Sequence, residues 1–526
     1  MNGGQLMACR INQLNKNTGV TYVYESVSFW DKKKKQPRNK KICVGKLDPT
    51  TQEFIPSKRL VPEQAAVRDP AVTASAEIVG TSIVLDAITD RLGLGNLLKS
   101  SFPNEHRQIL AMAYYLTSQG GPLSYCETWS KSHGHPLGES LASQRISEVL
   151  CSISVDGKQT FFSKWMNKVL EEDYLCYDIT SISSYSELNE YIKYGHNRDR
   201  DKMPQLNLAM LFGQKGRLPV YFQRMPGNIT DVTTVRNLLK TFKALEIRNI
   251  NYVMDKGFYS KKNVDELLAS RDRFTISIPL NNKWVQHVID DIYEVIHGPQ
   301  GYQRIDNEVL YVNSRLYPWG KDNRRCYLHL YYNALARANA VDRFSEEMLG
   351  YKVELESGKL ISEHQEAYDT FFVMKTTPKR GVKVSYNTEA VNQYINRYAG
   401  FQVLLTNSVK NPIEALQIYR DKDVVEKSFD DLKNQLDMKR LRMHSSAAVD
   451  GRLFVQFIAL IYMSALRREM RKSDLIKRYT VRELLQEMET LTKVKYSGKY
   501  GHILTEVTKA QREILKGLNI ALPNKS

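Results

Sequence analysis

The stretch Tyr-Leu-Cys-Tyr-Asp-Ile-Thr-Ser, residues 174–181, opens the part of the chain whose pattern is easiest to interpret. Its aromatic and β-branched residues favour a strand. Two more strands are expected over 205–212 and 219–224, on either side of the turn Gly213-Gln214-Lys215-Gly216, because glycines bound this turn between two apolar runs. Residues 174–224 therefore predict three consecutive strands.

The residues that follow alternate between helical and extended patterns. A helix is expected to start near Asp231, followed by a strand over 251–255, a helix over 260–270 and a strand over 274–279. The resulting order, β-β-β-α-β-α-β, resembles that of the ribonuclease H-like fold, in which the first and fourth strands are neighbours. We therefore predict an α/β protein built on a ribonuclease H-like mixed sheet.

Two aspartates are unusual for their places in these strands. Asp178 lies inside the first strand and Asp255 ends the fourth. Aspartate favours strands poorly, and a buried carboxylate is costly unless it binds a metal ion or another cation. If the two strands are adjacent, both carboxylates converge at one edge of the sheet. Either residue by itself is also consistent with a strand-end cap or an ordinary salt bridge.

A third acid lies in the stretch Tyr419 to Lys433, which reads Tyr-Arg-Asp-Lys-Asp-Val-Val-Glu-Lys-Ser-Phe-Asp-Asp-Leu-Lys. If this stretch is one helix, Lys422, Glu426, Phe429 and Lys433 share a face, with Tyr419 one turn earlier. A solvated surface helix with Lys422 and Glu426 as an i,i+4 ion pair is one interpretation. The other is that Glu426 is a metal ligand beside a phosphate backbone.

Three carboxylates at one place define a specific chemistry. Asp178, Asp255 and Glu426 would form an oxygen-rich site that suits Mg²⁺, with Mn²⁺ as a substitute, because these hard ions prefer carboxylate oxygens. Two ions about 3.5 to 4 Å apart activate the attacking oxygen and stabilise the leaving oxygen in phosphoryl transfer. No side-chain nucleophile is then required.

These motifs together resemble the bacterial insertion-sequence DDE transposases, whose ribonuclease H-like domain is interrupted by a β-rich insertion before the glutamate. Their signature is Tyr-x2-Arg-x3-Glu-x6-Lys, and this chain matches it at Tyr419, Glu426 and Lys433, with Lys422 in place of arginine. Lysine keeps the charge but loses the bidentate fork that grips a phosphate. Further similar stretches are 177–181, 218–220, 226–228 and 255–260, where Lys256 replaces the usual arginine.

The resemblance implies a function and a set of site residues. It implies a cut-and-paste transposase that binds terminal inverted repeats of double-stranded DNA, cleaves the ends and joins them to target DNA. Asp178, Asp255 and Glu426 would be the catalytic metal ligands, and Tyr419, Lys422 and Lys433 would contact phosphates near the element's end. In relatives an aromatic residue of the insertion stacks on a flipped base. Trp284 and Trp319 are both candidates, and either is also consistent with a core or turn tryptophan.

Basic residues elsewhere provide further candidate contacts to DNA. Arg198 and Arg200 fall in a loop between the first two strands, and Lys439 and Arg440 follow the glutamate segment. Eight Lys or Arg and no acid lie between residues 32 and 46, which fits either a solvated loop or an arm that follows the phosphate backbone.

Composition agrees with a polyanionic partner. The chain has 526 residues, a net charge of +17 and a pI near 9.3, which points to nucleic acid or an acidic membrane surface. The apolar run over 453–466 is too short to span a bilayer and is expected to be a buried helix. The six cysteines show no Cys-x-x-Cys spacing, and the start of the chain has no signal-peptide pattern. A cytoplasmic protein without membrane contact, associated with the bacterial nucleoid when bound to DNA, is expected.

The chain is long enough for about three or four domains, and we divide it into six segments. The following organisation is expected: a basic β-hairpin arm over 1–60, a helical DNA-binding region over 61–170, the first part of the ribonuclease H-like core over 171–279, the β-rich insertion over 280–399, the second part of the core over 400–480 and a basic helical region over 481–526.

Two other classes of protein remain consistent with the sequence. One is a catalytically inactive, transposase-derived protein that only binds DNA, although all three acids are present. The other is a metal-dependent DNA nuclease that cleaves without strand transfer. For a transposase, the pairing of two DNA ends predicts a homodimer in the active complex.

Overall fold

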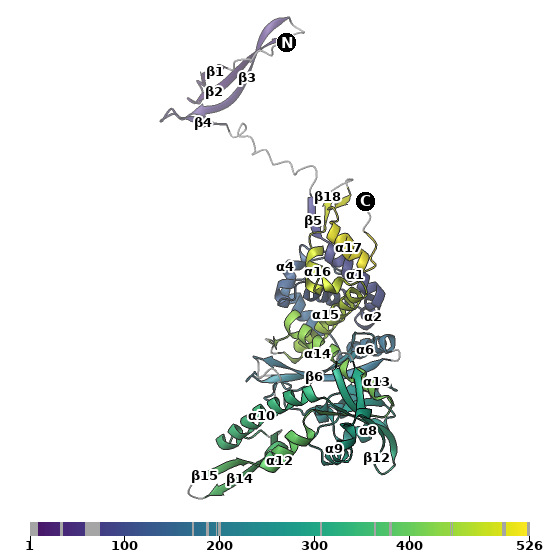
Figure 1. The fold of residues 1–526 in the computed structure, drawn as a ribbon. Helices are drawn as coiled ribbons and strands as arrows, with labels where there is room; N and C mark the ends of the chain where they lie inside the picture. Colours follow the sequence, from purple (N-terminus) through teal and green to yellow (C-terminus); the bar gives the residue numbers. More distant parts are fainter. Residues whose placement is uncertain are drawn as a thin grey trace. The chain divides into compact units, whose positions relative to one another are not determined.

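The computed structural model describes most of the chain, and Figure 1 shows its fold. The described residues are 9–31, 35–57, 74–170, 173–185, 189–195, 197, 201–305, 308–361, 364–377, 381–441, 443, 445–496 and 501–522. They divide into two compact units, of which the first comprises Met1–Ala76 with Val494–Ile503 and the second comprises Glu77–Lys493 with Leu504–Ser526.

Unit 1 is built from antiparallel strands. Its sheet has the order β1-β2-β3-β4, with β1 Cys9–Leu14, β2 Thr21–Asp31, β3 Gln36–Leu47 and β4 Phe54–Pro56. The predicted hairpin corresponds to β2 and β3, the central pair of a four-stranded sheet. Most of a three-stranded sheet of order β19-β18-β5 also belongs to this unit, with β5 Ala74–Ile78, β18 Thr492–Tyr496 and β19 His502–Leu504.

The centre of unit 2 is a ten-stranded mixed sheet. Nine of its strands follow the order β11-β12-β13-β16-β10-β9-β6-β7-β8, and β17 pairs with β6. The seven elements predicted after residue 174 are all present: β6 Tyr174–Ser184, β7 Gln205–Gly213, β8 Pro219–Pro226, α7 Asp231–Ala244, β9 Asn251–Met254, α8 Lys261–Ala269 and β10 Arg273–Ser277. As predicted, the first strand, β6, pairs with the fourth, β9, and the two run parallel.

The segment expected to be a β-rich insertion differs from the prediction. Its first strands extend the central sheet, since β13 pairs with β16, which in turn pairs with β10. The bounds here are α9 Lys283–Ile296, β11 Tyr302–Ile305, β12 Glu308–Trp319, β13 Arg324–Tyr332 and β16 Phe401–Thr406. Strand β16 is almost wholly buried, and β13 is buried over most of its length after two exposed arginines, which favours joining the main sheet over forming a separate one.

The rest of this segment forms a small substructure with its own core. It contains α10 Ala334–Ser357, α11 Gln365–Phe371, the hairpin β14 Phe372–Thr377 with β15 Gly381–Tyr386, and α12 Thr388–Gln393, followed by a π-helical turn Tyr394–Tyr398. Phe344, Met348, Leu355, Tyr368 and Phe372 pack together there. Figure 1 shows α10, α12 and the hairpin lying side by side. The segment is therefore of mixed helix and strand content.

Several helices that precede β6 contact one long helix from the C-terminal part of the chain. The helices before β6 are α1 Gly80–Leu92, α2 Leu94–Ser101, α3 His106–Ser118, α4 Cys126–Ser130, α5 Ser143–Ser152 and α6 Val155–Val169. Gly93 separates α1 from α2, and its φ of 62° places it in the left-handed region that glycine tolerates. Helix α6 also lies within the region that was predicted as helical.

The long helix α15, Ser446–Lys472, is the buried centre of the helical region. It contacts α3, α5 and β8, and Phe162 of α6 packs its ring against Tyr221 of β8 and Phe457 of α15. Helices and sheet thus share one hydrophobic core. By length and composition α15 could cross a membrane, but 94% of its most apolar window is buried inside the protein, which agrees with the predicted buried helix.

The chain continues beyond α15 with short elements. They are the 3-10 turn Leu475–Lys477, α16 Val481–Met488 and α17 Lys509–Gly517. Both helices start with a capping box, from Thr480 to Glu483 and from Thr508 to Gln511. The region after residue 480 was predicted as helical, and the strands β18 and β19 were not expected.

Candidate active site

Asp178 and Asp255 lie side by side at one edge of the sheet. The parallel register between β6 and β9 ends with Tyr177 opposite Met254. Asp178 is the residue after Tyr177, and Asp255 is the residue after Met254. Adjacent parallel strands are about 4.8 Å apart, so the pairing brings the two aspartates together as the sequence predicted.

The carboxylate of Asp255 is held by three donors. The Tyr419 hydroxyl donates to its Oδ1 at 2.6 Å, the Lys256 backbone N–H donates to the same oxygen at 2.8 Å, and the Lys422 ammonium lies 3.3 Å from Oδ2. Burial raises the pKa of Asp255, but the Tyr419 hydrogen bond and the Lys422 charge outweigh it, so the pKa lies below its ordinary value. Asp255 is therefore maintained in its charged form.

The expectation of one helix from Tyr419 to Lys433 is wrong. Helix α13 spans Pro412–Arg420, a turn follows, and α14 spans Asp423–Asp430 before a π-helical turn at Asp431–Gln435. The two helices follow different surfaces, because α13 packs against β9, β10 and β16 while α14 packs against β6 and β7. Tyr419 is consequently in another helix than Glu426, and Phe429 is buried in the core.

Lys422, at the start of α14, lies between two of the predicted ligands. Its ammonium lies 3.3 Å from Asp255 Oδ2 and 3.1 Å from Glu426 Oε1. Only 16% of the Lys422 side chain is exposed, against 56% for Glu426. Burial lowers the pKa of Lys422, but the charges of Asp255, Glu426 and Asp178 raise it to a net value above the ordinary one. The ammonium thus neutralises an acidic site, and the predicted Lys422–Glu426 ion pair is present.

A divalent ion fits the chemistry of this donor set. No group of three or more His, Cys, Asp or Glu side chains is close enough to hold a metal ion within the described part of the chain. Even so, Asp255 and Glu426 each direct one oxygen at the same ammonium group, and Asp178 is next to Asp255 in the sheet. The cation between them is at present a lysine.

The other predicted DNA contacts are scattered around this edge. Lys433 is half-buried in the π-helical turn, and Lys439 is exposed. Arg440, in β17 Arg440–Leu441 beside the end of β6, donates to the Tyr185 hydroxyl at 2.8 Å and pairs with Asp201 at 3.3 Å. Arg198 and Arg200 lie outside the described residues.

Both tryptophan candidates line one cavity. It has a volume of about 620 Å³ and also includes Tyr259 and Tyr317. Trp319 is only 5% exposed, and its Nε1–H donates to Asp265 at 2.6 Å. Trp284 is half-buried, donates to the Tyr259 hydroxyl at 3.0 Å and places its ring 5.1 Å from that of Tyr317. Trp284 is therefore the more accessible of the two rings.

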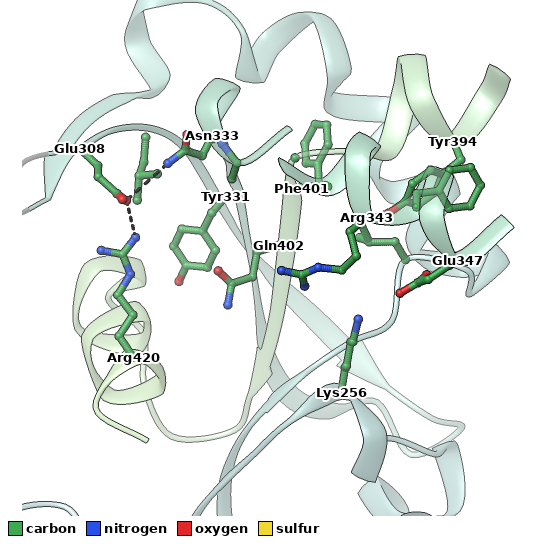
Figure 2. A pocket seen from close by; sticks show the side chains of 16 residues that line it. Lys256, Glu308, Tyr331, Asn333, Arg343, Glu347, Tyr394, Phe401, Gln402 and Arg420 are labelled. Atoms are coloured by element: carbon green, nitrogen blue, oxygen red, sulfur yellow. Dashed lines mark hydrogen bonds and ion pairs between the residues drawn. The ribbon is translucent and has the colours of Figure 1, made fainter. Parts of the chain in front are cut away.

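A second cavity begins directly beside the acidic edge (Figure 2). Its volume is about 380 Å³, and its lining includes Lys256, which follows Asp255, and Arg420, which follows Tyr419. Arg343 adds a third basic side chain, while Glu308 pairs with Arg420 at 2.8 Å. The lining of this cavity is thus rich in basic and aromatic side chains.

Some contacts of the site were not predicted. The hydrogen bond from Tyr419 to Asp255 and the ion pair of Lys422 with Asp255 join residues that are 164 and 167 positions apart, so no local pattern could reveal them. The cavity residues Arg343 and Arg420 are separated by 77 positions (420 − 343), so only the sheet pairing of β13 with β16 could reveal their proximity.

Comparisons with known proteins identify the family of this chain. The family model described as "Transposase DDE domain" matches residues 170–462, more than half of the chain. The chain belongs to this family, and so it is a DDE transposase by family, a class that generally uses divalent metal ions. Among solved structures, a piggyBac transposase synaptic complex with hairpin DNA is similar at 9% identity, with a TM-score of 0.33 over 78% of this chain and 70% of that chain. No curated protein matches the chain.

Proposed function

We propose that this protein cleaves the ends of its own mobile element and joins them to target DNA, with Asp178, Asp255 and Glu426 as the catalytic carboxylates on a ribonuclease H-like sheet. One observation carries the proposal. Asp178 and Asp255 occupy the next register position of neighbouring parallel strands, and Lys422 joins Asp255 to Glu426. Three acids from separated parts of the family's domain thereby belong to one charged cluster.

The cofactor in this proposal is Mg²⁺, or Mn²⁺ in its place, with two ions per site held by Asp178, Asp255 and Glu426. When bound, such ions supply Lewis acidity toward the scissile phosphate and the attacking oxygen. Tyr419 and the Lys256 amide orient the Asp255 carboxylate and keep it ionised. Lys422 must leave its place between the carboxylates, and its ammonium then becomes available to a phosphate of the DNA end.

The DNA contacts follow from this arrangement. Double-stranded DNA carrying terminal inverted repeats is the proposed partner, with Lys422, Lys433, Lys439 and Arg440 as phosphate contacts. Trp284 is the proposed stacking residue, since its ring is partly accessible in an aromatic cavity while that of Trp319 is buried. A 2-aminopurine placed near the DNA terminus should lose fluorescence on binding, and Trp284→Ala should remove that quenching. Unchanged quenching in this variant would contradict the assignment.

We further propose a bacterial insertion-sequence origin, a cytoplasmic location and a homodimer in the active complex. Coupled joining of two ends requires two active sites, which is the reason for a dimer. Short inverted repeats flanking the coding sequence are the genomic observation that tests the origin. Their absence would favour a transposase-derived protein that no longer moves its own gene.

The central test uses three isosteric variants. Asp178→Asn, Asp255→Asn and Glu426→Gln should each abolish Mg²⁺-dependent cleavage of a duplex that carries the terminal repeat, while binding of that duplex in Ca²⁺ is retained. Strand transfer of pre-cut ends should be lost in parallel. Full cleavage by any one variant would remove that residue from the site. Cleavage without any transfer in the wild type would favour a nuclease.

A further inference from the structure

Five basic side chains meet at a small pocket that none of the predicted catalytic residues lines. The pocket lies between the β7–β8 turn, α14 and the last part of α15, and has a volume of about 30 Å³. Its basic lining residues are Arg217, Lys427, Arg467, Arg468 and Arg471. Such a density of positive charge costs electrostatic free energy unless anions balance it.

Carboxylates balance only part of this charge. Arg467 forms an ion pair with Asp431, with Nη2 at 2.7 Å from Oδ1. Arg468 pairs with Glu469 at 3.2 Å. Within the described residues, no carboxylate oxygen lies within 4.0 Å of the charged groups of Arg217, Lys427 or Arg471.

The remaining cations act on one another. Burial lowers the pKa of Arg471, and the nearby charges of Arg217 and Arg467 lower it further. Like charges gathered without a counterion are destabilising, so an anion in the pocket would be bound favourably.

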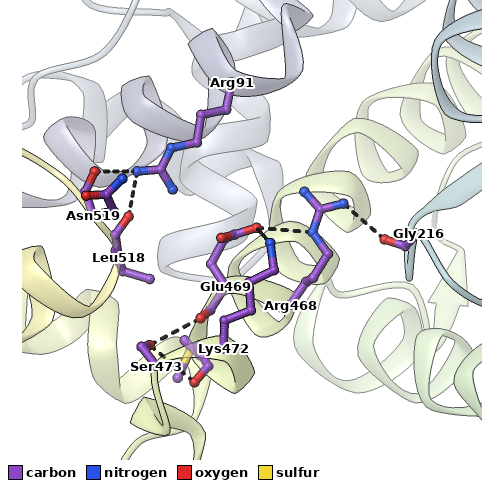
Figure 3. A network of polar contacts seen from close by, with 9 residues as sticks. Arg91, Gly216, Arg468, Glu469, Lys472, Ser473, Leu518 and Asn519 are labelled. Atoms are coloured by element: carbon purple, nitrogen blue, oxygen red, sulfur yellow. Dashed lines mark hydrogen bonds and ion pairs between the residues drawn. The ribbon is translucent and has the colours of Figure 1, made fainter.

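The turn that presents Arg217 is held in place by its neighbours. Asp173 accepts hydrogen bonds from the backbone N–H groups of Lys215 and Gly216, each at 2.8 Å. Arg468 donates to the Gly216 carbonyl at 3.1 Å (Figure 3). Arg217 itself has a φ of 50°, a left-handed conformation that non-glycine residues rarely adopt. The structure therefore maintains Arg217 beside the helix arginines at a conformational cost.

We propose that this pocket binds a backbone phosphate of DNA outside the active site. Guanidinium groups match phosphate oxygens in geometry, and the pocket is too small for a nucleobase. The inference rests on the proposed function. Lys427 directly follows Glu426 on α14, so a phosphate in the pocket would fix DNA against the helix that carries the catalytic glutamate.

The test measures the salt dependence of DNA binding. Two full-length variants are titrated with a terminal-repeat duplex over a series of salt concentrations. One is the double variant Arg217→Ala/Arg471→Ala, and the other is Lys427→Ala, which changes an exposed side chain. The slope of log Kobs against log salt should become shallower by about 0.9 for the lost phosphate contact. Arg471→Lys, which keeps the charge, should retain the wild-type slope. Arg478→Ala, from an exposed ion pair with Glu513, is the matched control for removing one charge.

The outcomes separate this inference from the proposed function. A wild-type slope in both Lys427→Ala and the double variant, with normal cleavage by the wild type, would overturn the phosphate site alone. A wild type that neither binds nor cleaves the duplex would overturn the proposed function itself. The salt slope can also be measured for a second, unrelated duplex that is added to protein already bound to the terminal repeat. If the variants change only this slope, the pocket binds a phosphate of target DNA. A change in end binding assigns it to the element's own end.

Discussion

Two aspartates at opposite ends of the same strand pair have opposite environments. Strands β9 and β10 run parallel. Asp255 follows β9 at its carboxyl end, and Asp272 precedes β10 at its amino end. As whole residues, Asp255 is half-buried and Asp272 is buried.

The two carboxylates also differ in their partners, and their pKa values shift in opposite directions. Burial raises the pKa of Asp272 to about 6, and the backbone N–H of Ile250, at 3.2 Å, offsets only part of this effect. For Asp255 the effect of burial is reversed by the Tyr419 hydroxyl and the Lys422 ammonium. At one end of the strand pair, Asp255 thus keeps its negative charge in the folded protein. At the other end, the folded state favours the neutral form of Asp272.

The largest expected effect is on catalysis at the exposed end. Asp255→Asn should lower the rate of DNA-end cleavage by about 10,000-fold, on the scale seen when one member of a catalytic unit is removed. Single-turnover cleavage of a labelled terminal-repeat duplex measures this rate. Asp272→Asn is the matched control and should cleave at nearly the wild-type rate. Equal losses in both variants would mean that Asp255 acts only through folding.

The second effect concerns stability at the buried end. Because the folded pKa of Asp272 is raised, the native state retains its proton more tightly, and wild-type stability should fall as the pH rises from about 4 to about 6. Asn is neutral at every pH and keeps an oxygen for the Ile250 N–H. Asp272→Asn should therefore be more stable than wild type by about 3 kcal/mol at pH 8 and nearly equal at pH 4. Urea unfolding at both pH values would reveal the difference, and a destabilised variant at pH 8 would refute it.

A smaller effect is expected from the cation that joins the acids. Lys422→Ala should weaken binding of the terminal-repeat duplex about tenfold at moderate salt and make the salt dependence shallower by about one phosphate contact. Lys422→Arg keeps the charge and adds a bidentate fork, and should bind at least as tightly as wild type. An unchanged salt slope in Lys422→Ala would leave Lys422 as a partner of Asp255 and Glu426 only.

The smallest effect is expected at Tyr419. Tyr419→Phe removes the hydroxyl that donates to Asp255, while Lys422 and the Lys256 amide remain. The loss should be about 1 kcal/mol of stability at neutral pH. It should shrink as the pH falls below the ordinary aspartate value of 3.8, because a protonated Asp255 no longer needs the donor. A loss of stability that is independent of pH would assign Tyr419 to packing alone.

Local signals in the sequence were sufficient for the strands of the catalytic part. Runs such as 174–181 and 251–255 combine aromatic and branched residues between clear turn residues, and their order predicted that β6 and β9 are neighbours. Asp178 and Asp255 could then be expected at one edge of the sheet, because their strands were predicted to be neighbours. The β11–β13 strands were harder to place, since nothing local tells whether an apolar strand extends an existing sheet or starts another.

The sequence by itself determined which acids are candidates for the active site, the basic character of the chain and the family to which it belongs. Tertiary structure decided how the charges are arranged around those acids. The Tyr419–Lys433 segment divides into two helices that pack on different strands. Helical periodicity predicted the Lys422–Glu426 ion pair, but the contact of Lys422 with Asp255, 167 positions away, depends on how these helices pack on the sheet. The arginine pocket arises in the same way, from a turn and two helices far apart in the chain.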